Sequence, residues 1–185
     1  PGDVILEPSA GNGLLIAHCR DHAGLQLNEY AAPRRARLRH AFPDAVITGH
    51  DGATINSTLA DAPRPSIVLM NPPFSALANV TGRVADTALR HISSALARLA
   101  PGGRLVTITG ANVGPELPAW RDAFVGLQER GRIVFTAAID GAVYAKHGTS
   151  FATRLTVIDK IPADDPSSFP ASSGMAPDAA TLLGW

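Results

Sequence analysis

The chain has 185 residues, the length of one typical domain, and its 45% hydrophobic content is enough for a substantial core. Its 16 basic and 16 acidic residues balance, so the chain has no strong overall charge with which to bind a polyanion or a membrane surface. An enzyme that binds nucleic acid in a local groove is still compatible with this balance. The single cysteine excludes a disulfide framework and a cysteine-based zinc site, and because neither a signal peptide nor a membrane span is visible we expect a cytoplasmic protein.

Short apolar runs alternate with helical patterns along the chain. In chain order, strands are predicted at residues 4–7, 25–29, 45–48, 67–70 and 104–109, and helices at 14–21, 31–42, 84–99 and 120–129. Two last strands, 133–139 and 154–159, have no helix-length segment between them and should pair as an antiparallel hairpin. The pattern predicts an α/β, Rossmann-like doubly wound fold, with a mostly parallel seven-stranded sheet and an antiparallel C-terminal hairpin.

Both ends of the chain suggest a domain taken from a longer polypeptide. The sequence opens on Pro1 rather than Met, and an apolar strand starts almost at once. Residues 162–185 are rich in Pro, Ser, Ala and Asp, a composition that is typical of a linker. We therefore expect one catalytic domain over residues 1–161 and a linker-like tail over 162–185. A small processed protein with a floppy tail is the alternative.

Four polar side chains follow predicted strands at nearly equal spacing. Glu7, Glu29, Asp51 and Asn71 are 22, 22 and 20 residues apart, about one strand–helix unit each. In open parallel sheets, ligands bind at the carboxyl ends of the strands, near the point where the strand order reverses. The spacing therefore predicts that these four side chains line one edge of the sheet.

The first strand runs into a glycine-rich turn, Glu7-Pro8-Ser9-Ala10-Gly11-Asn12-Gly13. Glycines allow a tight turn and let a ligand approach main-chain N–H groups. The third glycine of a nicotinamide-binding fingerprint is replaced by Ile16, and the Gly-Lys-Ser/Thr of a P-loop is absent. An acid before the glycines would repel a pyrophosphate but suit a ligand that carries an ammonium group. A plain strand-to-helix turn is the alternative.

A second motif, Asn71-Pro72-Pro73-Phe74, follows the fourth predicted strand directly. Two consecutive prolines fix the backbone and keep Asn71 out of the helical region. The motif presents one amide side chain, one main-chain carbonyl and one aromatic ring. The two oxygens can accept both hydrogens of an amino group, and the ring can stack on a planar base. An ordinary turn with an aromatic plug is the alternative.

With these two motifs the sequence resembles the class I S-adenosylmethionine-dependent methyltransferases. Residues 4–13 resemble their cofactor-binding motif, and residues 71–74 look like the catalytic motif of members that methylate exocyclic amino groups, above all N6 of adenine in DNA or RNA. The resemblance covers roughly residues 3–160. Residues 144–159 are similar to the closing hairpin of bacterial adenine methylases. They look most like the methylase portion that precedes a helicase region in large plasmid and phage proteins of the strawberry notch-like group.

The resemblance implies a cofactor site and a catalytic motif, and no metal. The residues implied to hold S-adenosylmethionine are Glu7, Pro8, Ser9, Ala10, Gly11, Gly13, Glu29, Tyr30, Asp51, Gly52 and Asn71. The residues implied to form the catalytic motif are Asn71, Pro72, Pro73 and Phe74. Glu7 and the turn would hold the methionine part, Glu29 would accept the ribose hydroxyls, and Asp51 would accept the adenine amino group.

On the target side, the resemblance implies that Asn71 and the Pro72 carbonyl bind the amino group and that Phe74 stacks on the base. Cys19 is interpreted as a core residue, which counts against ring-carbon methylation of cytosine, a reaction that needs a cysteine nucleophile. Complete adenine methylases usually carry a helix before the first strand, and it is expected to be missing here. No insertion is long enough for a target-recognition domain.

The expected function is methylation of adenine N6 in DNA. RNA adenine and a protein glutamine amide are alternative substrates, and a non-catalytic cofactor-binding module is a further alternative. The expected partners are DNA, RNA as the second choice, and further domains of a longer chain such as a helicase region, in a bacterial, plasmid- or phage-type context.

Overall fold

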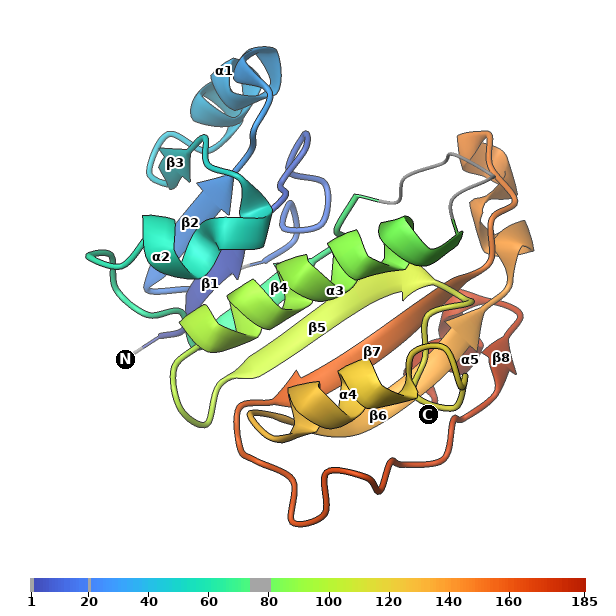
Figure 1. Ribbon diagram of the computed structural model, residues 1–185. Coiled ribbons are helices and arrows are strands. Elements are labelled where there is room, and N and C mark those ends of the chain that lie inside the picture. Colours follow the sequence, from blue (N-terminus) through green and yellow to red (C-terminus); the bar gives the residue numbers. More distant parts are fainter. Residues whose placement is uncertain (1, 20, 74–80) are drawn as a thin grey trace.

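The computed structural model describes residues 2–19, 21–73 and 81–185 (Figure 1). Eight strands form one sheet in the order β3-β2-β1-β4-β5-β7-β6-β8. Their bounds are β1 Val4–Glu7, β2 Gly24–Asn28, β3 Val46–Thr48, β4 Ile67–Met70, β5 Arg104–Gly110, β6 Arg132–Ile139, β7 Thr153–Asp159 and β8 Met175–Ala176. Strands β1 to β5 are parallel to one another, whereas β7 runs antiparallel between β5 and β6.

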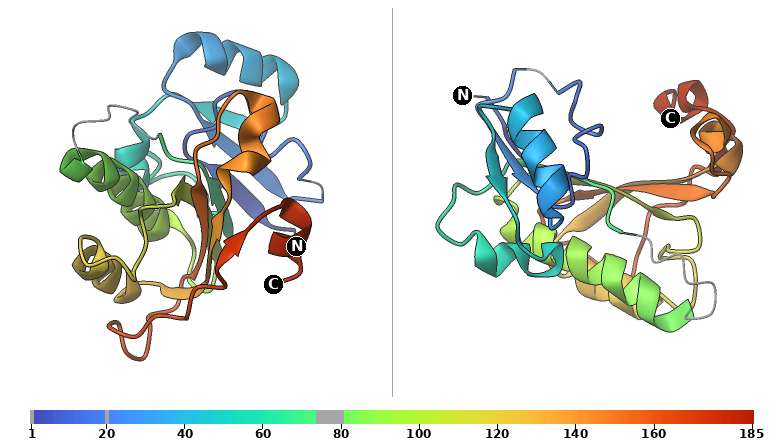
Figure 2. Two further views of the ribbon diagram at one scale, coloured as in Figure 1. Left: turned by 90° about the vertical axis from the view of Figure 1, so that its right-hand side faces the viewer. Right: turned by 90° about the horizontal axis from the view of Figure 1, so that it is seen from above.

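Helices cover both faces of this sheet (Figure 2). Helix α1 lies on one face, and α2, α3 and α4 lie on the other (Figures 1 and 2). The helices are α1 Ala32–Ala41, α2 Ile55–Thr58, α3 Thr81–Arg98, α4 Arg121–Gln128 and α5 Ala179–Leu183, with short 3-10 helices η1 Gly52–Thr54 and η2 Gly141–His147. No helix in the described part of the chain is long and apolar enough to cross a membrane.

Each face of the sheet has its own apolar core. On the α3 and α4 face, Leu6 of β1 and Val68 of β4 pack with Ile92 of α3. On the α1 face, Ile5, Leu25 and Leu27 pack with Leu38. Because helices cover both faces, the central strands need apolar residues on both sides, which explains the short uninterrupted apolar runs of the sequence.

The strand order reverses beside β1, which has β2 on one side and β4 on the other. The chain moves outward from β1 through β2 to β3, then returns to β4 on the opposite side of β1. The carboxyl ends of these four parallel strands therefore meet at one edge of the sheet. A ligand crevice is expected at such a reversal point.

The helix predicted at residues 14–21 does not form in the described part of that segment, residues 14–19 and 21. The described residues between β1 and β2 form turns and no helix, and Cys19 N donates to the Ile16 carbonyl at 3.0 Å in one of these turns. An eight-residue helix depends on packing an apolar face for its stability. Leu14 is 81% exposed and Leu15 is 38% exposed, so these two leucines provide no such face, whereas Cys19 does pack against the core of the α1 face.

The sheet has eight strands and not the predicted seven. The additional strand, β8, pairs parallel with the edge strand β6 and comes from the segment expected to be a linker-like tail. Other tail residues also contact the domain: Gln128 donates to the carbonyls of Pro166 and Ser168, and Phe169 packs against the core of the α3 face. Periodicity could not predict this strand, because two residues are too few to show an alternation of apolar and polar side chains.

Candidate active site

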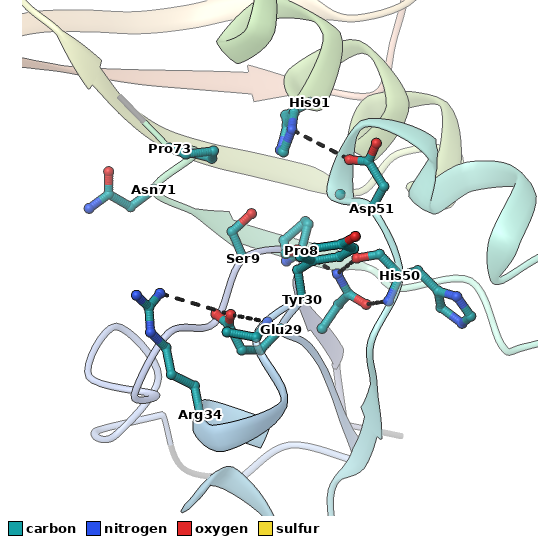
Figure 3. A pocket seen from close by; sticks show the side chains of 13 residues that line it. Pro8, Ser9, Glu29, Tyr30, Arg34, His50, Asp51, Asn71, Pro73 and His91 are labelled. Carbon is teal, nitrogen blue, oxygen red and sulfur yellow. Dashed lines mark hydrogen bonds and ion pairs between the residues drawn. The ribbon is translucent and has the colours of Figure 1, made fainter. Parts of the chain in front are cut away.

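A cavity of about 620 Å³ opens at the carboxyl ends of β1 to β4 (Figure 3). Its walls are formed by the turn after β1, the end of β2, the start of α1, the loop between β3 and η1, the end of β4 and one side chain of α3. Its lining residues are Pro8, Ser9, Asn28, Glu29, Tyr30, Ala31, Arg34, His50, Asp51, Gly52, Asn71, Pro73 and His91. The site predicted from strand-end spacing therefore coincides with a cavity.

The structure brings most of the predicted site residues to this cavity. Those that line it are Pro8, Ser9, Glu29, Tyr30, Asp51, Gly52, Asn71 and Pro73. Those that lie outside its lining are Glu7, Ala10, Gly11, Gly13 and Pro72. Phe74 falls outside the described residues. Of the four equally spaced polar side chains, three line the cavity and Glu7 is buried beneath it.

Glu29 follows β2 and ties the glycine turn to the start of α1. Its carboxylate accepts hydrogen bonds from Gly11 N at 2.9 Å and from Ala31 N at 2.7 Å. Arg34, which sequence reasoning did not place in the site, brings Nη1 to 3.9 Å from Oε1 of this carboxylate. Each carboxylate oxygen has a second lone pair, so Glu29 can still accept hydrogen bonds from hydroxyl groups of a ligand.

Glu7 ends β1 and is only 2% exposed. Its Oε2 has no hydrogen-bond partner among the residues that the structure describes. Burial, with a smaller contribution from the Glu29 charge, raises the pKa of Glu7 to about 8. At neutral pH this carboxyl is therefore largely protonated in the free protein. A cation bound beside it would favour its ionised form, which is the property expected of a carboxyl that receives an ammonium group.

The glycine turn uses two left-handed residues. Gly11 has φ +56° and Gly13 has φ +79°, in the region that residues with a Cβ rarely adopt. A Cβ on Gly13 would lie 2.5 Å from the Phe42 ring and 3.1 Å from Leu38, whereas a Cβ on Gly11 would meet nothing within 4 Å. Gly13 thus lets the turn pack directly on α1 and the residue that follows it.

Gly13→Ala should destabilise the fold by about 1–3 kcal/mol, because it combines an unfavourable φ with a clash against Phe42. Gly11→Ala is the matched control, since it carries the strain without the clash, and should cost about 1 kcal/mol. Urea unfolding of both variants measures the difference. An equal or larger loss for Gly11→Ala would show that the packing on Phe42 is unimportant.

Asn28, which sequence reasoning missed, ends β2 and joins the turn after β1 to the loop after β3. Its Nδ2 donates to the carbonyls of Pro8 and His50, both at 2.9 Å. Its Oδ1 accepts from His50 N and from Thr48 Oγ1, both at 2.8 Å. All four positions of this amide are thus satisfied, which suits a buried polar group. The clue in the sequence was that Asn28, directly before Glu29, is a polar residue in an otherwise apolar strand.

Asp51 caps η1 and presents its carboxylate to the cavity. Oδ1 accepts a hydrogen bond from Ala53 N at 2.9 Å, and the side chain is 63% exposed. His91 Nε2 lies 3.9 Å from the same Oδ1. Oδ2 has no hydrogen-bond partner in the described part of the chain, and is therefore available to accept from a ligand. This is the acceptor that an exocyclic amino group of a base requires.

His91 comes from α3 and lines the cavity beside Asp51, in a position that sequence reasoning did not recognise (Figure 3). It is 7% exposed, and burial lowers the pKa of its imidazole; the Asp51 charge opposes this effect and the Arg90 charge adds to it. A Cβ on Gly52 would lie 2.9 Å from His91 Nδ1, so glycine is required there for close contact. The sequence does contain a clue, because this histidine is a polar residue three positions after Ala88, on the side of the helix that carries the apolar residues.

The second motif directly follows β4. Asn71 and Pro73 are exposed and line the cavity, whereas Pro72 is buried. In the view of Figure 3, Asn71 and Asp51 lie on opposite sides of the cavity, with Ser9 and Pro8 between them. The amide of Asn71 is thus available to a second ligand group, away from the carboxylate of Asp51. No group of His, Cys, Asp or Glu side chains within the described ranges could hold a metal ion.

No protein-family model matches the sequence, and no curated protein does so significantly. Solved structures of similar fold are found. A protein from Listeria monocytogenes, described as a class I S-adenosylmethionine-dependent methyltransferase, superposes with a TM-score of 0.67 at 11% identity over 98% of this chain and 62% of its own. The M protein of the type I restriction enzyme EcoKI gives a TM-score of 0.65 at 18% identity, over 89% of this chain and 41% of its own.

The N-methyltransferase NodS from Bradyrhizobium japonicum, crystallised with S-adenosyl-L-homocysteine, gives a TM-score of 0.60 at 14% identity over 86% of this chain and 78% of its own. At these identities the likeness establishes the fold alone, which is the Rossmann-like fold of class I S-adenosylmethionine-dependent methyltransferases. The chain spans less than two thirds of the Listeria protein and less than half of the EcoKI protein.

Proposed function

We propose that the protein is an S-adenosylmethionine-dependent methyltransferase that transfers a methyl group to an exocyclic amino group, N6 of adenine in DNA. The main support for this proposal is that the polar residues after β2, β3 and β4 line one cavity. Two acceptors lie on different sides of its wall, Asp51 Oδ2 and the Asn71 amide oxygen, and neither has a hydrogen-bond partner among the described residues. The geometry suits one ligand base on the Asp51 side and a target amino group on the Asn71 side.

S-adenosylmethionine fits the residues that are present. Glu7 has a buried carboxyl oxygen with no hydrogen-bond partner within the described ranges, and its pKa is raised, as expected of a group that pairs with the ammonium of the methionine part. Glu29 can accept the ribose hydroxyls, and Asp51 can accept from the adenine amino group. The similar NodS structure binds S-adenosyl-L-homocysteine, which supports S-adenosylmethionine as the cofactor and its demethylated form as the product.

Asn71 and Pro72 would bind the target. The amide oxygen of Asn71 and the Pro72 carbonyl can each accept one hydrogen of the amino group, and Phe74 would stack on the base. The lone pair of an exocyclic amino group is delocalised into the ring, which makes the nitrogen a weak nucleophile. Two acceptors placed out of the ring plane favour the geometry in which this lone pair is available.

The chain's own contribution to catalysis is therefore positioning and electrostatics. The bound cofactor supplies an electrophilic methyl group, and the cavity holds the amino nitrogen in line with it. Preorganised acceptors stabilise the positive charge that develops on this nitrogen. A base inside a duplex would have to be flipped out to reach the site, because Asn71 lies at a strand end inside a cavity.

DNA is the proposed substrate because the Asn-Pro-Pro-Phe motif and the likeness to the EcoKI M protein point to the same chemistry. RNA adenine, a glutamine amide of a protein, and a non-catalytic cofactor-binding role are the other outcomes of the test. We also propose that further segments supply target recognition, such as a helicase region in a strawberry notch-like protein of bacterial plasmids or phages. A cytoplasmic location is part of the same proposal.

Transfer of a radiolabelled methyl group from S-adenosylmethionine tests this function. The acceptors are DNA that lacks adenine methylation, total RNA and a protein extract, each with and without the enzyme. Label that appears in DNA and is recovered as N6-methyladenine is the expected result. Label in RNA or protein would replace the substrate assignment, and no transfer to any acceptor would favour the non-catalytic role.

Asp51→Ala should weaken binding of S-adenosyl-L-homocysteine by about two- to tenfold, because it removes the acceptor for the adenine amino group. Asp61→Ala changes an exposed carboxylate outside the cavity lining and should leave the affinity unchanged. Isothermal titration calorimetry on both variants measures the effect. Equal affinities would show that the adenine does not lie beside Asp51.

A further inference from the structure

His91 is the cavity residue that the proposed function leaves unexplained. It is the single α3 side chain that the described cavity lining contains, and it reaches the site from the helix that follows the catalytic motif. Its ring lies against Gly52, where a Cβ would come within 2.9 Å of Nδ1 and 3.0 Å of Cε1. A residue with any side chain at position 52 would displace the ring, so the contact depends on Gly52 in η1 as well as on His91 in α3.

The tautomer of His91 follows from its surroundings. Nδ1 is buried and has no hydrogen-bond partner in the ranges that the structure describes, while Nε2 lies 3.9 Å from Asp51 Oδ1. Because burial lowers the pKa of the ring, His91 is neutral at neutral pH and carries one N–H. With the proton on Nδ1, the Nε2 lone pair would face the carboxylate and repel it. The proton therefore belongs on Nε2, which makes this atom a donor directed at Asp51.

Asp51 needs such a second constraint. Its Oδ1 is held by one backbone donor, Ala53 N at 2.9 Å, and its side chain is 63% exposed, so one contact leaves the carboxylate free to rotate. A second donor to Oδ1 would fix the plane of the carboxylate and leave Oδ2 for a ligand in the cavity. The 3.9 Å separation is too long for a hydrogen bond, and a shift of about 1 Å brings the two atoms into contact.

We propose that His91 is a positioning residue that orients Asp51 through Nε2–H, and that it thereby sets the preference of the cavity for a base with an exocyclic amino group. The inference rests on the proposed function, because it concerns the base of the cofactor. An oriented carboxylate accepts from the amino group of adenine and repels the carbonyl oxygen of hypoxanthine at the same position. His91 therefore determines selectivity without touching the reacting atoms.

The test compares two ligands, S-adenosyl-L-homocysteine and its hypoxanthine counterpart S-inosyl-L-homocysteine, by calorimetry at one pH. The wild type should prefer the adenine ligand. His91→Leu removes the donor and should lower the ratio of the two dissociation constants by about three- to tenfold. His91→Gln can place an amide N–H near the position of Nε2 and should restore most of the ratio, whereas His91→Asn, whose amide is too short to do so, should not.

Ser94→Ala is the control for an effect that comes only from altered packing between α3 and its neighbours. Ser94 Oγ accepts from Asn56 N at 3.1 Å, so this variant loosens the contact of α3 with α2 without touching the cavity. It should bind both ligands as the wild type does, and thermal unfolding shows which variants are folded. A folded His91→Leu with the wild-type ratio, or a Ser94→Ala with the same altered ratio, would overturn the role of His91 alone. A wild type that binds neither ligand would overturn the proposed function, and this inference with it.

Discussion

Asn71→Ala should slow methyl transfer by about 10²–10³-fold while leaving the affinity for S-adenosyl-L-homocysteine nearly unchanged. The reason is positional. Asn71 follows β4 and is exposed at the wall of the cavity, on the other side from Asp51 in the view of Figure 3. Its amide oxygen is one of two acceptors proposed for the target amino group, and it acts most strongly in the transition state, where the nitrogen becomes positive.

The measurement is single-turnover methylation of adenine-containing DNA at saturating cofactor. Asn71→Asp is the matched variant, because a carboxylate keeps an acceptor oxygen in the same place, and it should retain much more activity than Asn71→Ala. The prolines that shape the turn remain in both variants, so both should fold. Equal rates for the wild type and Asn71→Ala would remove the catalytic role of this motif.

Glu7→Gln should stabilise the protein at neutral pH and weaken cofactor binding. The buried carboxyl of Glu7 has a pKa of about 8, whereas in the unfolded chain it titrates near the ordinary value of 4.5. Between these values the unfolded chain has lost a proton that the folded protein retains. The stability contribution of this carboxyl is therefore fully present below about pH 4.5 and is lost as the pH rises through about 8.

The expected gain for Glu7→Gln is on the order of 2–4 kcal/mol at pH 7.5 and small at pH 4.5, because each unit of pKa shift corresponds to about 1.4 kcal/mol. Urea unfolding of the wild type and the variant across this range measures it. Glu129→Gln makes the same change of residue type at an exposed position after α4 and is the control. A Glu7→Gln protein that is less stable than the wild type at pH 7.5 would contradict the assignment of a destabilising buried carboxyl.

The two effects of Glu7→Gln have one cause. A carboxyl held in a buried position without a full set of hydrogen bonds weakens the fold, and the same group can pair with a ligand cation once it is ionised. Residues of binding sites commonly sacrifice stability in this way. An increase in stability together with a loss of affinity for S-adenosyl-L-homocysteine would identify Glu7 as such a residue.

The sequence predicted the parts of this molecule that depend on local pattern. Polar residues follow the apolar runs of β2, β3 and β4, and this regular spacing located the cavity through Glu29, Asp51 and Asn71. Strand positions and the antiparallel pairing of β6 with β7 followed from periodicity and from the lack of a helix between them. These features are encoded within single elements, so no tertiary information was needed.

The features that were missed depend on tertiary contacts. Residues 14–21 have the composition of a short helix, but Leu14 finds no surface to pack on. Strand β8 exists because the edge of β6 offers unpaired backbone groups, which no periodicity in the tail reveals. His91 reaches the cavity because α3 packs against η1, and Asn28 links loops that are distant in the sequence. A polar residue at an otherwise apolar position was the one available clue for both.

If the carboxyl edge of β1 to β4 binds S-adenosylmethionine, calorimetric titration of the protein with S-adenosyl-L-homocysteine should show saturable binding at a single site. Asp51→Ala should weaken this binding, and Asp61→Ala should leave it unchanged. Absence of binding to the wild type at millimolar ligand, or binding that is insensitive to Asp51→Ala, would show that this edge of the sheet is not the cofactor site.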